Sequence, residues 1–151
     1  MREILFRGKR IDKDEWVEGF YVRLNEKEHR IYSGFAETDC GDYYPDFYTV
    51  DPETVGQLVS DVPDKNDKEI FEGDIVCCKQ YIGGNFVDYH VVTGFVEMKY
   101  GAFGLRRGKT PHRPSGYYRP FKDWLEDYEY EVIGNIHDNP ELIGGATNEA
   151  D

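Results

Sequence analysis

The sequence lacks the long apolar run that a membrane span requires. No stretch approaches the roughly 20 apolar residues needed to cross a bilayer, and the opening residues Met1–Arg7 lack the apolar core of a signal peptide. Cysteine is also scarce, because the 151 residues include only three, two of them adjacent. This odd number is a poor basis for a disulfide framework and is typical of a reducing compartment. We therefore expect a cytoplasmic protein.

Positive charge is scarce as well. The chain has 18 Lys and Arg residues against 30 Asp and Glu residues, which gives a formal net charge of -12. The average surface of such a protein repels phosphate backbones and anionic lipid headgroups, which disfavours general binding to nucleic acids or membranes. With 39% hydrophobic and 15% aromatic residues the chain can still bury a core, and its length fits one domain or two small ones.

Catalytic signatures are missing from the sequence. Serine elbows, phosphate-cradling glycine loops and the His-Glu-x-x-His pattern do not occur. His137 lies in Asn135–Leu142, which superficially resembles a His-Asn nuclease motif, but no second histidine or paired thiols lie near it in sequence. A strand end followed by an Asn-Pro turn explains the same residues. We predict that the protein is not an enzyme and has no catalytic residues.

A stretch that begins at Asp64 gathers carboxylates and two thiols without the spacing of a metal site. Counted as a calcium loop from Asp64, it has Glu69 in place of the sixth-position glycine and Ile75 in place of the twelfth-position glutamate. Cys77 and Cys78, adjacent on a strand, point to opposite faces of a sheet and cannot bind one zinc ion together. We predict no metal and no cofactor, and interpret the stretch as tight turns that lead into strands.

The residues that are abundant indicate an antiparallel β protein. Tyr, Phe, Val and Ile recur in short alternating runs separated by Gly, Asn, Asp and Pro, and long helical stripes are absent. The pattern predicts strands over residues 4–6, 16–24, 29–32, 70–71, 74–81, 86–100, 103–106 and 130–136.

Four segments do not fit the strand pattern. Glu37–Asp46 shows neither the two-residue alternation of a strand nor the 3.6-residue repeat of a helix, and is predicted to be a loop. Asp51–Thr54 has the Asp cap and first-position Pro of a helix start, so we expect a single helical turn there. A helix of about two turns is expected from Pro120 to Tyr128, because the large apolar residues repeat with helical spacing. The tail at residues 144–151 is expected to be disordered.

Five pieces, which together span almost the whole chain, follow one another in a recognisable order: Arg2–Gly8, Pro52–Gln57, Asp64–Val76, Gly101–Leu105 and Glu131–Leu142. In this order they resemble the YopX-like family of bacteriophage and prophage proteins. Asp67 stands where the family pattern usually has Gly. The resemblance implies a mainly β, YopX-like fold with a small SH3-like β-barrel, a phage or prophage setting and self-association, and it implies no catalytic residue.

Together, the pattern and the resemblance predict an antiparallel meander plus a small SH3-like β-barrel, with one short helix near the C-terminus. We divide the chain into an N-terminal β region with an acidic aromatic loop at residues 1–60, and an SH3-like barrel region with a basic insertion and the short helix at residues 61–143. The disordered tail at residues 144–151 follows.

One segment departs from the acidic average. Gly104–Lys122 contains no acidic residue and interleaves positive charges with aromatic rings, the composition of a stacking surface for single-stranded nucleic acid. Alternatively, its positive charges lie against carboxylates of the same subunit or a neighbour, with Glu37–Asp46 as one candidate. We favour this protein surface, because the net charge opposes polyanion binding. The candidate interaction residues are Arg106, Arg107, Lys109, Arg113, Tyr117, Tyr118 and Arg119.

The sequence therefore predicts a non-catalytic, self-associating protein-interaction module. So many short strands and aromatic side chains leave sheet edges and apolar patches that need covering, which favours a homo-oligomer. The partner can also be a host or phage protein, and no membrane is expected. A nucleic-acid-binding module that uses residues 104–122 is the main alternative. An acidic DNA mimic that inhibits a host factor is a third interpretation, and an undetected enzyme is the last.

Overall fold

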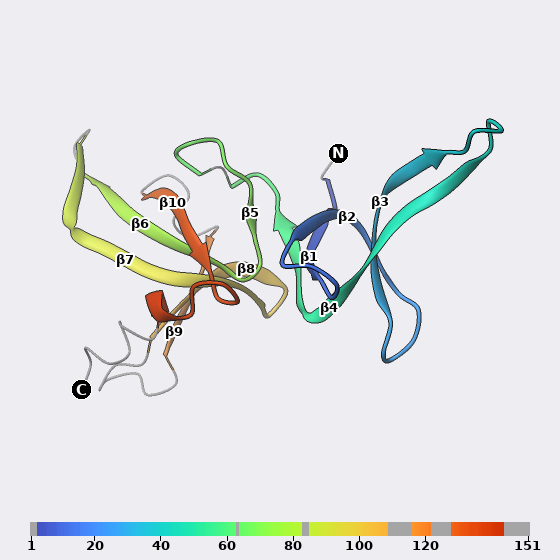
Figure 1. The fold of residues 1–151 in the computed structure, drawn as a ribbon. Coiled ribbons are helices and arrows are strands. Elements are labelled where there is room, and N and C mark those ends of the chain that lie inside the picture. The colour runs from blue at the N-terminus through green and yellow to red at the C-terminus, as the bar shows by residue number, and fades with distance from the viewer. Residues whose placement is uncertain (1–2, 63, 83–84, 109–115, 122–127, 144–151) are drawn as a thin grey trace. The chain divides into compact units, whose positions relative to one another are not determined.

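A computed structural model describes residues 3–62, 64–82, 85–108, 116–121 and 128–143 (Figure 1). The chain divides into two compact units, Met1–Leu58 and Val59–Asp151, where the sequence analysis placed a boundary after residue 60. Both units are built from antiparallel strands, which confirms the mainly β prediction. Over this part of the chain, no helix has the length and apolar character of a membrane span.

In the first unit, the strands β1 to β4 form a ring through the sheet order β1-β2-β3-β4 and the additional pairing of β1 with β4. β1 pairs with both β2 and β4, β2 pairs with β3, and β3 pairs with β4. Val50 therefore lies opposite Arg10 on one side and His29 on the other. Each of these four strands therefore pairs with two others of the ring. The strands are β1 (Phe6–Arg10), β2 (Trp16–Arg23), β3 (His29–Glu37) and β4 (Tyr43–Val59).

The inside of the ring is filled by residues that alternate with exposed ones along the strands. On β2, Val17 is buried whereas Glu18 and Phe20 are exposed, as expected of a half-buried strand. Val17, Ile31 and Val50 form the core of this unit. Gly8 lies directly against it, because a Cβ atom at Gly8 would come within 3.0 Å of the Val50 Cβ.

β3 and β4 continue past their ring partners as a twisted two-stranded ribbon (Figure 1). β2 pairs with β3 only as far as Tyr32, whereas the β3–β4 pairing continues to Glu37, opposite Tyr43. A short turn closes the ribbon, in which the Thr38 N–H donates to the Asp42 carbonyl oxygen at 2.7 Å. The predicted loop over residues 37–46 is therefore wrong. Only residues 38–42 form a turn, and cross-strand pairing orders the rest.

The helical turn predicted at residues 51–54 is also wrong, because these residues lie inside β4. Lys9 pairs with Asp51 but Arg7 pairs with Gly56, so that residues 52–55 bulge out opposite Gly8 alone. Asp51 still acts as a local cap, since its Oδ1 accepts the N–H of Glu53 at 3.1 Å. The Asp-Pro signal thus marks a bulge within a strand and not the start of a helix.

The second unit contains a five-stranded antiparallel sheet in the order β10-β6-β7-β8-β9. Among the described residues, its core includes Ile70, Val76, Val96 and Leu105. Among the described residues, β10 and β9 are the two ends of this sheet, and the SH3-like barrel stays a prediction. The strands of this unit are β5 (Ile70–Phe71), β6 (Asp74–Ile82), β7 (Asn85–Lys99), β8 (Ala102–Arg107), β9 (Tyr117–Pro120) and β10 (Tyr128–Asn135).

The carboxylate-rich stretch from Asp64 is a pair of turns, as the sequence predicted. Asp64 is 2% exposed, and its two carboxylate oxygens accept the N–H groups of Asn66 and Val132, each at 2.5 Å. Asp67 has a φ of 59°, the left-handed conformation that glycine adopts most easily, which fits its place in the family pattern. The second turn is fixed by Asp74, whose Oδ2 accepts the Phe71 N–H at 2.8 Å.

Among the described residues, a short C-terminal helix lies at residues 141–143. The short helix that the sequence predicts from Pro120 to Tyr128 falls mostly on residues 122–127, outside the described residues. Of its two ends, Phe121 is buried against Tyr130, with ring centroids 5.3 Å apart, and Tyr128 begins β10 instead of ending a helix. The tail at residues 144–151 also lies outside the described residues.

Candidate interaction surface

The outward side of the first unit carries a row of aromatic side chains across three strands. Residues directly opposite each other in an antiparallel pair share a face of the sheet. Tyr32 of β3 lies opposite Phe20 of β2 and opposite Phe47 of β4, so these three side chains share one face. The Tyr32 and Phe47 rings are in contact, with centroids 5.4 Å apart. The neighbouring residue Ile31 points the other way, into the core.

A bulge in β3 extends this row along the ribbon. Tyr32 and Phe35 are three residues apart, a spacing that places side chains on opposite faces of an unbroken strand. The register shifts between Tyr32 and Gly34, however, because Ser33 is an extra residue in β3. Gly34 has a φ of 150°, which glycine adopts readily. Phe35 then pairs with Pro45, two residues from Phe47, and so joins the face of Tyr32.

We call this surface the outer aromatic face and define it by Phe20, Tyr32, Phe35, Tyr43 and Phe47. It is exposed to a degree that is unusual for apolar side chains, with 75% of Phe35, 71% of Tyr43 and 67% of Phe20 accessible to solvent. Single exposed apolar residues are common, but contiguous ones mark interaction surfaces. The outer aromatic face is therefore the strongest candidate for a binding surface among the described residues.

The two ends of the outer aromatic face differ in charge, because one carries the Arg30–Glu28 ion pair and the other is acidic. At the ring end, the Arg30 guanidinium lies over the Phe47 ring at 4.0 Å and donates to Glu28 at 2.7 Å. Its hydrogen bond with Tyr32, followed by that with Glu28, raises the pKa of Arg30, so it stays cationic. At the tip, Glu37 lies opposite Tyr43 on the same face. The turn beyond it contains acidic residues and no basic one.

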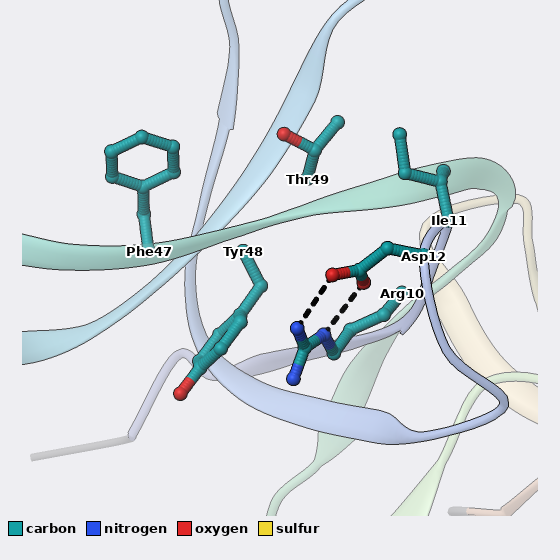
Figure 2. A pocket seen from close by; sticks show the side chains of 6 residues that line it. All are labelled: Arg10, Ile11, Asp12, Phe47, Tyr48 and Thr49. Atoms are coloured by element: carbon teal, nitrogen blue, oxygen red, sulfur yellow. Dashed lines mark hydrogen bonds and ion pairs between the residues drawn. The ribbon is translucent and has the colours of Figure 1, made fainter.

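A pocket of about 370 Å³ lies beside the base of the ribbon and is shown in Figure 2. Phe47 and Tyr48 line it from opposite sides of β4. Arg10 reaches into it, with its guanidinium 4.5 Å from the centroid of the Tyr48 ring. The Nε and Nη2 atoms of Arg10 donate to the two carboxylate oxygens of Asp12 at 2.9 and 2.7 Å. The other lining residues are Ile11 and Thr49.

The charged groups of this pocket, Arg10 and Asp12, already neutralise each other in an ion pair. The hydrogen bond to Asp12 raises the pKa of Arg10, and the same bond lowers the pKa of Asp12. Glu15 lies 3.5 Å from Nη1 of Arg10, so the guanidinium is already shared between two carboxylates. An anionic ligand would have to displace both. The pocket therefore offers neither a ready anion site nor a nucleophile beside a base.

Metal and thiol chemistry also receive little support elsewhere. Within the described ranges, no three His, Cys, Asp or Glu side chains are placed to hold a metal ion. Cys78 is buried in the core of the second unit, and burial raises the pKa of its thiol, which suppresses the reactive thiolate. Cys77 is half-buried and Cys40 is exposed in the ribbon turn.

The basic segment predicted from the sequence folds in part into the β8–β9 hairpin. Arg106 pairs with Glu97 of the neighbouring strand β7, with Nη2 and Oε1 2.6 Å apart, and its guanidinium lies 5.6 Å from the Tyr118 ring centroid. Its counter-charge is thus a carboxylate of the same sheet. Lys109 and Arg113 lie outside the described residues.

The tyrosines of the hairpin are also engaged. Tyr117 packs against the core of the second unit. The Tyr118 hydroxyl donates to the carbonyl oxygen of Ala102, and burial raises the pKa of Tyr118. Arg119 is half-buried and lies opposite Leu105, whereas Arg107 is exposed at the end of β8. The structure therefore brings Arg106, Tyr118 and Glu97 together, and among the candidate residues it describes only Arg107 is exposed.

The model of the YopX protein family matches residues 5–144, which include nearly all of both units. The chain belongs to the YopX protein family. The YopX match includes β3 and β4, with the ribbon that they form, as well as the turns at residues 64–74. No curated protein and no solved structure matched the chain.

Proposed function

We propose that this YopX-family protein is a non-catalytic protein-interaction module that associates with itself through the outer aromatic face. The observation that supports the proposal most is the exposure of Phe35 and Tyr43 on a ribbon that extends beyond the ring. Burying large aromatic side chains is the main source of stability in protein interfaces, and each contributes roughly 150–250 Å² of area.

The ribbon is also an ordered element, which favours a binding role. Its turn is closed by backbone hydrogen bonds, and the Thr38 Oγ1 accepts the Asp42 N–H at 3.1 Å. A pre-formed surface loses little conformational entropy when it binds. We place this module in a phage or prophage protein that acts in the cytoplasm of a bacterial host, as the resemblance to YopX-like proteins implies.

The alternative of nucleic-acid binding by residues 104–122 has less support. Arg106 and Tyr118 have partners within the second sheet, so binding to phosphate or bases would have to compete with those contacts. The non-catalytic part of the proposal is supported by the Arg10 ion pairs and by the buried Cys78 thiol.

The proposal is tested by measuring the molar mass with light scattering after size exclusion, over a range of protein concentrations. The wild-type protein should have a mass above that of the monomer. Replacing Phe35 and Tyr43 together with Ser should shift the mass to that of the monomer, because it removes the two most exposed rings of the face.

A matched control is the Tyr100→Ser variant. Tyr100 is 91% exposed, more than any residue of the outer aromatic face, but it lies in the turn after β7 and belongs to no aromatic row. Its replacement should leave the mass unchanged. A wild-type protein that stays monomeric at the highest concentration, or a Phe35/Tyr43 double variant with unchanged mass, would contradict the proposal.

A further inference from the structure

We infer that the outer aromatic face docks against the same face of a second copy in an antiparallel, two-fold arrangement. In this arrangement Glu37 of each copy meets Arg30 of the other. The inference rests on the proposed self-association and specifies its geometry, which the exposed rings alone do not determine.

The charges at the two ends of the face favour this orientation. Arg30 lies on the outer aromatic face, since it contacts both Tyr32 and Phe47 there. Glu37 lies on the same face, opposite Tyr43. The two side chains are about 23 Å apart along β3 at roughly 3.3 Å per residue. A parallel arrangement would bring the two acidic tips together, whereas an antiparallel one places each acidic tip against the Arg30–Glu28 ion pair of the other copy.

The apolar residues are placed symmetrically between these charges. The midpoint between Arg30 and Glu37 falls at the bulge, between Ser33 and Gly34. Tyr32 and Phe35 lie on either side of it, so a two-fold rotation about the bulge brings Tyr32 of one copy over Phe35 of the other. Offset or edge-on aromatic pairs of this kind are favourable beyond the area that they bury.

The backbone at the bulge allows the two faces to approach closely. Gly34 pairs with Asp46, whose side chain lies on the face opposite that of Pro45 and Phe47, so the bulge places no side chain between Tyr32 and Phe35 on the outer aromatic face. The neighbouring Ser33 is exposed, with its hydroxyl directed to Asp46. The centre of the proposed contact is therefore unobstructed by large side chains of β3.

The first test is charge reversal on the intact protein. Arg30→Glu and Glu37→Arg should each weaken self-association by about tenfold or more, because each creates two like-charge contacts in the dimer. Mixing the two variants should restore association as a heterodimer, in which both contacts are again complementary. The Arg30→Glu/Glu37→Arg double variant should restore the homodimer, whereas in a parallel dimer it would keep the like-charge contacts.

The second test uses the cysteine that the ribbon already carries. Cys40 is exposed at the tip of the ribbon. Lys27 precedes the bulge by the same number of residues as Cys40 follows it. A Cys40→Ser protein that also carries Lys27→Cys, mixed with wild-type protein under mild oxidation, should form a disulfide between Cys40 and the introduced thiol. The Cys40→Ser single variant measures the background from Cys77.

The outcomes separate this inference from the proposed function. A wild-type dimer whose affinity is unchanged by both charge reversals would overturn the antiparallel geometry and leave self-association intact. Efficient Cys40–Cys40 cross-linking would do the same, because it places the two tips side by side. A wild-type protein that is monomeric throughout would overturn the proposed function itself, together with this inference.

Discussion

The outer aromatic face and the β8–β9 hairpin both place arginine beside aromatic rings on neighbouring strands, but their surroundings differ. In the hairpin, the Arg106 guanidinium is paired with Glu97, and Tyr118 donates to a carbonyl oxygen within the same sheet. On the outer aromatic face, Phe35 and Tyr43 lie on a ribbon beyond the ring and are mostly exposed. Similar compositions therefore stabilise a fold in one region and leave a surface open for binding in the other.

The difference teaches that strand register, and not composition, decides which aromatic and charged side chains are available. Arg106 reaches Glu97 because their strands are adjacent and the two residues lie diagonally across the β7–β8 pair. Phe35 is left open because β3 and β4 extend past β2 and β1. The variants below test this comparison in decreasing order of effect.

The largest effect on stability is expected at the buried Phe71, and the exposed Phe35 is its contrast. Phe71 is 2% exposed in the second unit, and Phe71→Ala should lower the free energy of unfolding by about 3–5 kcal/mol, because it leaves a cavity. Phe35→Ala should change it by no more than about 0.5 kcal/mol in the monomer, because the ring is 75% exposed. Urea unfolding at low protein concentration measures both. Equal losses would show that the ribbon is part of a core.

A second prediction concerns the buried carboxylate of Asp64. Asp64→Ala removes the acceptor of the Asn66 and Val132 N–H groups and should cost at least about 2 kcal/mol of stability in the second unit. Glu69→Ala, at an exposed position of the same stretch, is the control and should have little effect. Hydrogen exchange should show faster exchange of the Val132 amide in the Asp64 variant. Unchanged protection there would argue against this anchoring role.

The smallest effect is expected at Arg106. Arg106→Gln breaks the ion pair with Glu97 and should cost about 1 kcal/mol or less, since partly exposed pairs contribute little. The loss should shrink in high salt, which screens the pair. Arg107→Gln, at the exposed end of β8, should have a smaller effect still. If wild-type protein binds single-stranded nucleic acid and Arg106→Gln abolishes that binding without changing stability, the hairpin is the functional surface instead.

Much of the fold was predictable because its turns and the alternation along its strands depend on residues that are close in sequence. The turns after Asp64 follow from Asn, Asp and Gly, which accept left-handed or tight backbone conformations, and Asp67 and Gly73 have positive φ values. Alternation along the strands predicted that Cys77 and Cys78 face opposite sides, and Cys78 is buried whereas Cys77 is half-buried. The family resemblance rested on five separate pieces in order, and the family model matches residues 5–144, which the strand pattern alone does not provide.

The candidate surface was not predictable, because a bulge interrupts the two-residue alternation of side chains along β3. Tyr32 and Phe35 have the wrong spacing for one face, and only the extra residue Ser33 brings them together. The acidic aromatic segment after Phe35 was therefore read as a loop. Conversely, the basic segment was identified from composition, but the pairing of Arg106 with Glu97 depends on the register of β7 and β8, which a sequence does not specify.

The ribbon also has a consequence for how related chains can differ in length. Ring pairings involve residues 29–32 of β3 and residues 47–57 of β4, so that the intervening part can grow or shrink without disturbing the first core. Inserting one residue pair between the bulge and the tip would turn the distal side chains to the opposite face, whereas two pairs would restore them. The reach of the ribbon can thus change in steps of about 7 Å while its recognition face is kept.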